Sequence, residues 1–184
     1  MLLFSSAKPK LTFVKLSEIN EAALYQKRLE KVTQWFTEEW GYLHDTEKTP
    51  EQAFNDRKQY LSENADAINL VFYGKLMVGA FRVEAKKLVG KRLKASEIWF
   101  MYVDPLCREL GIGRQILEEI KRLSLAKDMP DDMVLLETLR FCLNRFYKQV
   151  GAKWVCENQI GSEPTDFLRI DIKSKTSLTT SVMI

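Results

Sequence analysis

A short segment with two closely spaced glycines is the part of this chain whose residue types and spacing could do chemistry. It reads Arg-Glu-Leu-Gly-Ile-Gly-Arg over residues 108–114, with glycines at Gly111 and Gly113. It follows an apolar stretch that ends at Val103 and precedes an apolar pattern of helical spacing. Glycines let consecutive backbone N–H groups point at one place, and a helix start adds about half a positive charge. The segment therefore predicts an anion-binding loop between a strand and a helix.

Two common nucleotide-binding loops do not fit this segment. A dinucleotide fingerprint would place a third glycine at position 116, which is Ile116, and no P-loop lysine follows the glycines. On the pattern alone, two glycines in a turn are also compatible with plain loop geometry. The surrounding elements must decide between these interpretations.

The elements around the loop indicate an α/β fold with a mixed sheet. Apolar or alternating stretches predict strands at about 10–16, 67–73, 76–83, 96–103, 133–138, 153–158 and 166–173. Apolar stripes predict helices at about 21–40, 49–63, after Gly113, and at 141–150. Three strands joined by short turns must be antiparallel, whereas the strand–helix–strand unit around Gly111 must be parallel.

Length, composition and charge exclude several classes. The 184 residues, 46% hydrophobic and 29% charged, predict one domain with a core at about 10–173 and a polar tail at 174–184. A net charge of +3 does not indicate a nucleic-acid or membrane partner, and the basic run at 86–94 is expected to be a solvated hairpin loop rather than a phosphate site. The chain shows no signal peptide or membrane-helix pattern. Three cysteines without CxxC spacing favour a cytoplasmic location and argue against zinc.

The loop and its context resemble the acetyl-CoA site of the GNAT (GCN5-related) N-acetyltransferase family. The family's loop pattern, Arg/Gln-x-x-Gly-x-Gly/Ala, matches Arg108, Gly111 and Gly113. The stretch Phe-Tyr-Lys-Gln-Val-Gly-Ala at 146–152 is similar to the family's later Phe/Leu-Tyr-x-x-x-Gly-Phe motif. The resemblance covers nearly the whole chain. It implies the GNAT acyl-CoA N-acyltransferase fold, with about six or seven strands and about four helices, acetyl-CoA as co-substrate, and no metal.

The resemblance also implies which residues would bind acetyl-CoA. The pyrophosphate would lie on backbone N–H groups of the loop, and the pantetheine arm would pair along the strand end, where an N–H could stabilise an oxyanion. The residues assigned in this way are Met101, Tyr102, Val103, Arg108, Glu109, Leu110, Gly111, Ile112, Gly113 and Arg114. Where the family often has Asn, seven residues before the tyrosine, this chain has Arg140, which either reaches a phosphate or faces water. Asn144, nearby but out of register, is a further candidate contact.

Direct transfer to an amine requires an acid and a base. Tyr147 occupies the place of the tyrosine that protonates the CoA sulfur in many relatives; the alternative is a core or rim tyrosine. Glu97 lies eleven residues before Arg108. The glutamate base of the histone acetyltransferase branch has the same offset from its own loop. In an apolar strand, desolvation would raise its pKa; the alternative is a solvated strand-end glutamate. Glu137 and bulk water are the other candidate bases, and direct attack leaves no need for Cys107 as a nucleophile.

The acceptor pocket of relatives borders the segment between the first two helices. In this chain that segment includes Trp35, Glu38, Glu39, Trp40, Tyr42, His44, Asp45 and Glu47. Acids beside aromatics suit the primary amine of a small molecule or peptide, although a charged helix face over core aromatics gives the same pattern. The predicted function is an N-acetyltransferase, and the alternative is a non-catalytic acyl-CoA-binding module. The acceptor, the acyl chain length and the choice between monomer and homodimer stay open.

Overall fold

The computed structural model describes residues 10–43, 48–87, 94–126, 131–139, 143–160 and 163–172. Seven strands form one mixed sheet in the order β1-β2-β3-β4-β5-β7-β6. The strands are β1 (Leu11–Lys15), β2 (Ile68–Tyr73), β3 (Leu76–Lys87), β4 (Lys94–Val103), β5 (Met133–Thr138), β6 (Ala152–Ile160) and β7 (Glu163–Asp171). The α-helices are α1 (Ala22–Trp40), α2 (Pro50–Glu63), α3 (Ile112–Leu125) and α4 (Asn144–Gln149). The predicted element order and mixed sheet are confirmed.

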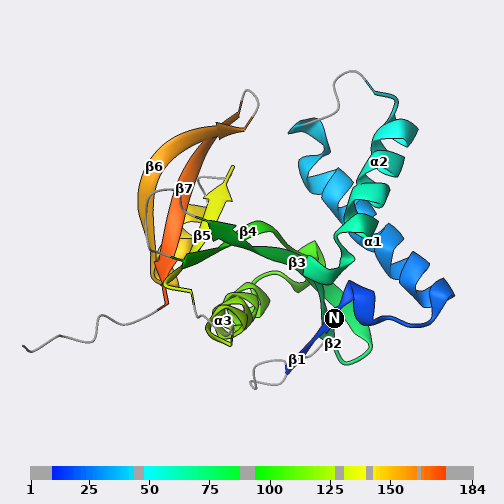
Figure 1. Ribbon diagram of the computed structural model, residues 1–184, viewed down its shortest axis with the longest axis horizontal. Helices are drawn as coiled ribbons and strands as arrows, with labels where there is room; N and C mark the ends of the chain where they lie inside the picture. Colours follow the sequence, from blue (N-terminus) through cyan, green and yellow to red (C-terminus); the bar gives the residue numbers. More distant parts are fainter. Residues whose placement is uncertain are drawn as a thin grey trace, which may run out of the picture.

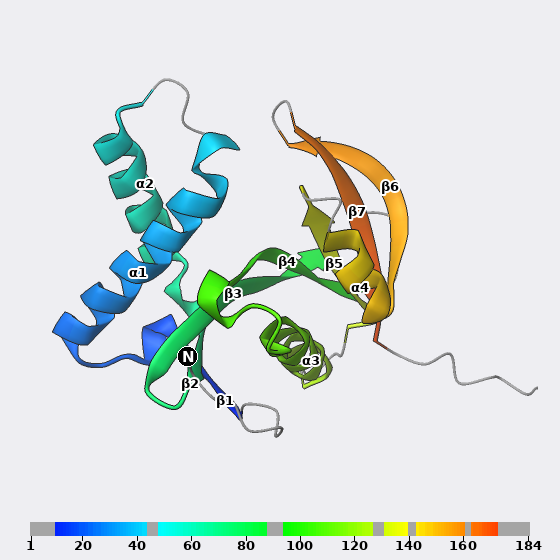
Figure 2. The same ribbon diagram turned by 180° about the vertical axis from the view of Figure 1, so that it is seen from behind.

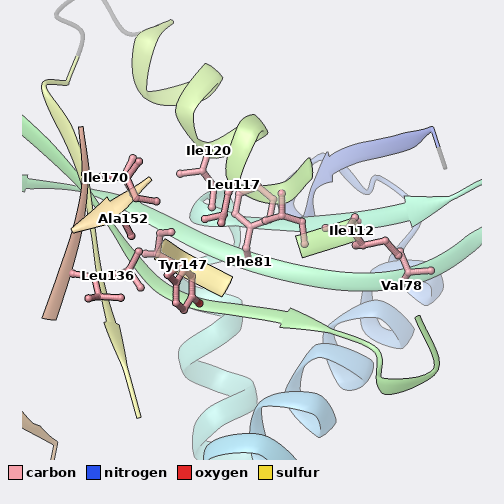
Figure 3. Packing of buried hydrophobic residues seen from close by; sticks show 14 of the residues in the cluster. Val78, Phe81, Ile112, Leu117, Ile120, Leu136, Tyr147, Ala152 and Ile170 are labelled. Atoms are coloured by element: carbon pink, nitrogen blue, oxygen red, sulfur yellow. The ribbon is translucent and has the colours of Figure 1, made fainter. Parts of the chain in front are cut away.

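The two faces of the sheet are covered by different helices. The helices α1 and α2 lie side by side on one face, and α3 lies against the other (Figures 1 and 2). Beneath α1 and α2, a cluster of buried side chains includes Leu29, Trp35, Leu61, Leu70 and Tyr102. A second cluster joins α3 and α4 to the opposite face and includes Phe81, Leu117, Ile120, Leu136 and Tyr147 (Figure 3). Each face therefore has its own core.

Local sequence signals explain where the helices begin. At α2, the Thr49 hydroxyl accepts a hydrogen bond from the Gln52 N–H at 3.2 Å, and the Gln52 side chain accepts one from the Thr49 N–H at 3.1 Å. With Pro50 at the first helical position, this is the capping box expected from the sequence. At α3, Gly111 precedes the first turn with φ +77°, a left-handed conformation that favours glycine.

The central strand β4 separates from β5 partway along its length. β4 pairs with β3 in antiparallel fashion, but its parallel pairing with β5 joins only residues 95–98 to residues 133–136. Past that point, β4 keeps its partner on the β3 side alone. The register between β3 and β4 also shifts here, which leaves Trp99 in a bulge with 55% of its surface exposed. The separation of β4 from β5 and the bulge at Trp99 create the space in which a site can form.

The first long hairpin extends further than the sequence analysis predicted. β3 continues to Lys87 instead of ending near 83, and β4 begins at Lys94 instead of 96. The charged residues of this extension are compatible with a strand because they pair with one another, as Lys86 does with Glu97. Residues 88–93 of the predicted basic loop, and the predicted polar tail, lie outside the described residues. Among the described residues, no helix is long and apolar enough to cross a membrane.

Candidate active site

A cleft of about 1440 Å³ opens where β4 and β5 part. Its walls come from the end of α1, from α2, from β4 and the loop after it, and from the start of α3. The predicted residues that line it are Glu97, Met101, Tyr102, Val103, Arg108, Glu109, Leu110, Gly111, Ile112, Gly113, Arg114 and Tyr147. The fold thus brings nearly all of the predicted site residues to one cavity.

The loop between β4 and α3 forms the predicted cradle of backbone donors. Asp104 holds its first turn, because its carboxylate accepts a hydrogen bond from the Leu106 N–H at 3.0 Å. Glu109 and Gly111 both have left-handed backbone conformations, with φ values of 68° and 77°. These turns direct the chain into α3, whose first-turn N–H groups have no carbonyl one turn earlier to bind. The start of α3 therefore offers the backbone donors that an anion site requires.

Close contact between α3 and α4 shapes the same region. A Cβ atom at Gly113 would lie 3.2 Å from Cζ of Phe146, so a larger residue there would press on α4. Phe146 in turn contacts Tyr147 edge to face, with ring centroids 5.1 Å apart. In the second turn of α3, the buried side-chain nitrogen of Gln115 has no hydrogen-bond partner among the described residues, and Gln115 lines the cleft. An unpaired buried donor is costly, so this amide fits a polar ligand.

Tyr147 reaches the cleft from the face of the sheet that carries α3. Only 7% of its surface is exposed, and it packs in the cluster beneath α3 and α4. Burial raises the pKa of its phenol to about 12. The hydroxyl is protonated near neutral pH, as a phenol with an ordinary pKa of about 10 also is, and the raised pKa makes it a weaker acid. No described residue is a hydrogen-bond partner of this hydroxyl, so it is available to a ligand.

Glu97 lies on the opposite face of the sheet. Ser96 bonds to Ser124 of α3 at 3.0 Å, so the next residue of β4 points away from α3. The Glu97 carboxylate accepts a hydrogen bond from the Lys86 ammonium at 2.6 Å, and 18% of its side chain is exposed. The carboxylate is therefore largely removed from solvent, as an apolar strand predicts, but it is paired with an ammonium group, which neither alternative of the sequence analysis included.

Glu137 provides a second carboxylate beside the parting. It follows the last residue of β5 that pairs with β4, and it lines the cleft. It lies two residues beyond Leu135, which packs with Ala95 on the face away from α3. Its carboxylate accepts hydrogen bonds from the Asn158 amide at 3.0 Å and from the Thr165 hydroxyl. Both candidate bases are thus on the face opposite Tyr147.

An arginine cluster on this face was missed by the sequence analysis. Arg82, only 4% exposed, donates hydrogen bonds to Glu84, Tyr60 and Asn64. Its guanidinium also lies 4.9 Å from the ring centroids of both Tyr60 and Trp99. The cluster ties α2 to the sheet and supports the bulged Trp99 in the cleft. Its members are far apart in the sequence, and the only available signal was a lone arginine in an apolar strand.

In the segment proposed to border the acceptor, between α1 and α2, some side chains belong to the core and others line the cleft. Trp35 is buried and stacks on Tyr102 at 4.9 Å, so the core interpretation is correct for it. Neither Trp35 nor Glu38 lines the cleft, whereas Glu39, Trp40 and Tyr42 do. His44, Asp45 and Glu47 lie outside the described residues.

Of the three remaining residues predicted to contact the cofactor, Arg108 and Asn144 bond to other parts of the protein. The Arg108 guanidinium donates to the Val103 carbonyl at 3.0 Å and pairs with Glu39 at 3.4 Å, and its backbone N–H donates to the Pro105 carbonyl at 3.4 Å. Both of the Arg108 groups predicted to contact the cofactor are therefore already bonded within the protein. Asn144 does not line the cleft; its amide donates to Asp166, which also accepts from Trp154. This geometry does not support a cofactor contact for Asn144. Arg140 lies outside the described residues.

Cys107 does not have the surroundings of a nucleophile. It is buried at the base of the loop, and desolvation, with a smaller contribution from Asp104, raises the pKa of its thiol. A raised pKa disfavours the thiolate, which is the reactive form. Cys107 is therefore poorly suited to act as a nucleophile.

Comparison with known families identifies the class of protein. Residues 29–151, more than half of the chain, match the sequence model of the acetyltransferase (GNAT) family. The chain belongs to this family, as the loop and tyrosine motifs indicated. No curated protein sequence matches the chain.

Solved structures share the fold. A histone acetyltransferase HPA2 and related acetyltransferase from Corynebacterium glutamicum aligns with a TM-score of 0.64 at 13% identity, covering 90% of this chain and 98% of that one. Arabidopsis thaliana Naa50, in complex with the bisubstrate analogue CoA-Ac-MVNAL, aligns with a TM-score of 0.57 at 16% identity, covering 89% and 98%. N-acetylglutamate synthase from Neisseria gonorrhoeae, complexed with coenzyme A and N-acetyl-glutamate, aligns with a TM-score of 0.59 at 10% identity, covering 90% and 36%. At these identities the likeness shows the fold alone.

Proposed function

We propose that the protein is an N-acetyltransferase that moves the acetyl group of acetyl-CoA to a primary amine by direct attack in a ternary complex. The observation that carries the proposal is the arrangement across the parting of β4 and β5. A buried, protonated Tyr147 lies on one face of the sheet, and the carboxylates of Glu97 and Glu137 lie on the other. Direct transfer needs a proton donor at the leaving thiolate and a proton acceptor at the amine, on opposite sides of the reacting carbonyl.

The donor half of the cleft fits acetyl-CoA. The N–H groups at the start of α3 suit a pyrophosphate, and the unpaired Gln115 amide supplies a further donor. The backbone of residues 99–102 has no strand partner on the β5 side, and the Val103 carbonyl there accepts a bond from Arg108, so residues 99–102 can pair with the amide groups of the pantetheine arm as a strand would. The structure of Arabidopsis thaliana Naa50 contains a bisubstrate analogue that includes CoA, and that of N-acetylglutamate synthase contains coenzyme A.

The transfer itself uses groups already present in the cleft. The amine nitrogen attacks the thioester carbon, a backbone N–H of β4 stabilises the developing oxyanion, and the C–S bond breaks. Tyr147 protonates the thiolate, while Glu97 takes the proton from the amine, directly or through water. Glu137 and bulk water are the alternative proton acceptors. We treat residues 1–184 as one catalytic domain and expect it to act in the cytoplasm.

A thiol-release assay tests the proposal. The full chain is incubated with acetyl-CoA and a panel of small primary amines, polyamines and peptides, and free CoA is measured with a thiol reagent. Amine-dependent release is expected, with the acetylated product identified by mass spectrometry. Coenzyme A binding in calorimetry without turnover on any amine would support the non-catalytic acyl-CoA-binding module instead. Absence of both binding and turnover would overturn the assignment altogether.

A further inference from the structure

One lysine of the protein lies where an acceptor amine is expected. The ammonium nitrogen of Lys86 is 2.6 Å from Oε2 of Glu97, the predicted base. Both residues line the cleft that also contains the donor loop and Tyr147. The side chain of Lys86 is 45% exposed, so it is free to move within the cleft. In this arrangement the protein presents a primary amine to its own proton acceptor.

The strand register directs Lys86 toward the reaction centre. Lys86 pairs across the hairpin with Ala95, and Glu97 lies two residues further along β4. The last residue of β4 that pairs with β5 is Ile98, directly after Glu97. Because the ammonium group already reaches Glu97, it lies beside the point where β4 and β5 separate, which is where the proposed function places the acetyl group.

We propose that Lys86 is a self-acetylation site, modified by the protein's own acetyl-CoA; the inference rests on the proposed function. The Lys86 ammonium gives a proton to Glu97, and the neutral nitrogen attacks the thioester carbon. The new N–C bond forms as the C–S bond breaks, and Tyr147 protonates the leaving thiolate. The second proton of the attacking nitrogen then returns to the Tyr147 phenolate through solvent, so that only the proton on Glu97 is released. The net change converts a lysine ammonium and acetyl-CoA into acetyl-lysine, free coenzyme A and one proton.

Self-acetylation would also change the acceptor half of the cleft. The amide of acetyl-lysine carries no charge, so it cannot maintain the ion pair with Glu97. The carboxylate then becomes available to an ammonium group of an external acceptor. Lys86 thus acts first as an intramolecular acceptor and afterwards leaves the position that the external amine needs.

The chain offers a matched control in Lys48. Lys48 also lines the cleft and forms an ion pair at 2.6 Å, in this case with Asp56 of α2. Its side chain is 49% exposed, close to the 45% of Lys86. Exposure and ion pairing are therefore alike in the two lysines, but only Lys86 is paired with a predicted base on β4. Non-enzymatic acetylation should label both lysines equally.

The experiment follows acetylation with a labelled donor. The purified full chain is incubated with trideuterated acetyl-CoA, and peptide mass spectrometry measures the labelled acetyl group at each lysine over time. Labelling of Lys86 is expected to be about 100-fold faster than labelling of Lys48, because only Lys86 is served by an acid and a base. The rate constant should not depend on protein concentration, since the reaction is intramolecular. Lys86→Arg should abolish labelling at position 86, Glu97→Gln should slow it, and Lys48→Arg should leave it unchanged.

The outcomes separate this inference from the proposed function. Turnover on an external amine with no label at Lys86, or with equal label at both lysines, overturns self-acetylation and leaves the transferase intact. Labelling that accelerates with protein concentration also overturns it, because the transfer is then between molecules. Coenzyme A release that is absent in every arm overturns the proposed function itself. If the purified chain already carries an unlabelled acetyl group at Lys86, Tyr147→Phe prepared in parallel should lack it.

Discussion

We divide the cleft into a donor half, proposed to bind acetyl-CoA, and an acceptor half, proposed to bind the amine. The two halves are built from different parts of the polypeptide. The donor half relies on backbone groups: two left-handed turns, a helix start and an unpaired strand edge. The acceptor half relies on side-chain pairs that bridge separate elements, such as Lys86 of β3 with Glu97 of β4 and Arg82 of β3 with Tyr60 of α2. Backbone groups are fixed once the fold forms, whereas side-chain pairs can be exchanged one at a time. We infer that the fold determines the donor and that replaceable side chains determine the acceptor.

The largest expected effect is at Tyr147, where the two halves meet. Tyr147→Phe removes the proposed acid, so kcat should fall by about 100-fold or more. The dissociation constant of coenzyme A should change less than twofold, because the proposed binding contacts come from the backbone donors at the start of α3 and along β4. Steady-state kinetics and calorimetry on the same preparation check both values. An unchanged kcat would show that Tyr147 is only a core residue.

The raised pKa of Tyr147 also predicts how the unfolding free energy depends on pH, which the Tyr147→Phe variant can test independently of activity. Below pH 10 the phenol is neutral in both the folded and the unfolded state. Between pH 10 and the folded pKa of about 12, the unfolded phenol ionises while the folded one stays neutral, so stability falls as pH rises. Two pKa units correspond to roughly 2–3 kcal/mol of unfolding free energy. Tyr147→Phe should lack this component, as urea unfolding at pH 9 and pH 11.5 would show.

The next effect concerns the backbone of the donor half. Gly111 has φ +77° and open space around its missing Cβ, so Gly111→Val acts through backbone strain and not through crowding. Strain of about 1–2 kcal/mol or more should weaken coenzyme A binding by about tenfold, because the loop must relax to another conformation. The KM for the amine should change little. Calorimetry with coenzyme A measures the first effect, and initial rates at saturating acetyl-CoA measure the second.

Gly74 provides the control for that substitution. It lies in the turn between β2 and β3 with φ +59° and equally open surroundings, and it does not line the cleft. Gly74→Val should therefore lower the melting temperature by a similar amount without changing coenzyme A affinity. Equal losses of affinity in both variants would mean that global destabilisation, and not the cradle, controls donor binding.

The same contrast explains what could be predicted from the sequence. The donor loop was predictable because glycine spacing, a helix start and an apolar strand are all local signals. The element order was predictable for the same reason, down to the capping box at Thr49. The ion pairs of the acceptor half were not predictable, since Lys86–Glu97 and the Arg82 cluster depend on strand register and on α2 packing against β3. Glu97 was proposed as a base from the family's offset to the loop and stays a prediction, and its ion pair with Lys86 was not predicted.

Arg108 gives the smallest expected effect and tests whether the two halves are coupled. Its guanidinium joins the donor loop to the Val103 carbonyl and, at 3.4 Å, to Glu39 at the end of α1. Arg108→Lys keeps the charge but loses the geometry that reaches both partners. With 42% of the arginine side chain exposed, the ion pair is screened, and unfolding free energy should fall by less than about 1 kcal/mol.

Because Arg108 contacts both halves, its substitution should change two constants together. We expect the dissociation constant of coenzyme A and the KM of the amine each to rise by about two- to threefold, consistent with a contribution below 1 kcal/mol. Gly111→Val, by contrast, should change only the first constant. Glu39→Gln removes the same contact from the α1 side, so the double variant should be no worse than the more affected single variant. If Arg108→Lys changes one constant alone, the donor and acceptor halves work independently, and the acceptor can be exchanged without any adjustment of the loop.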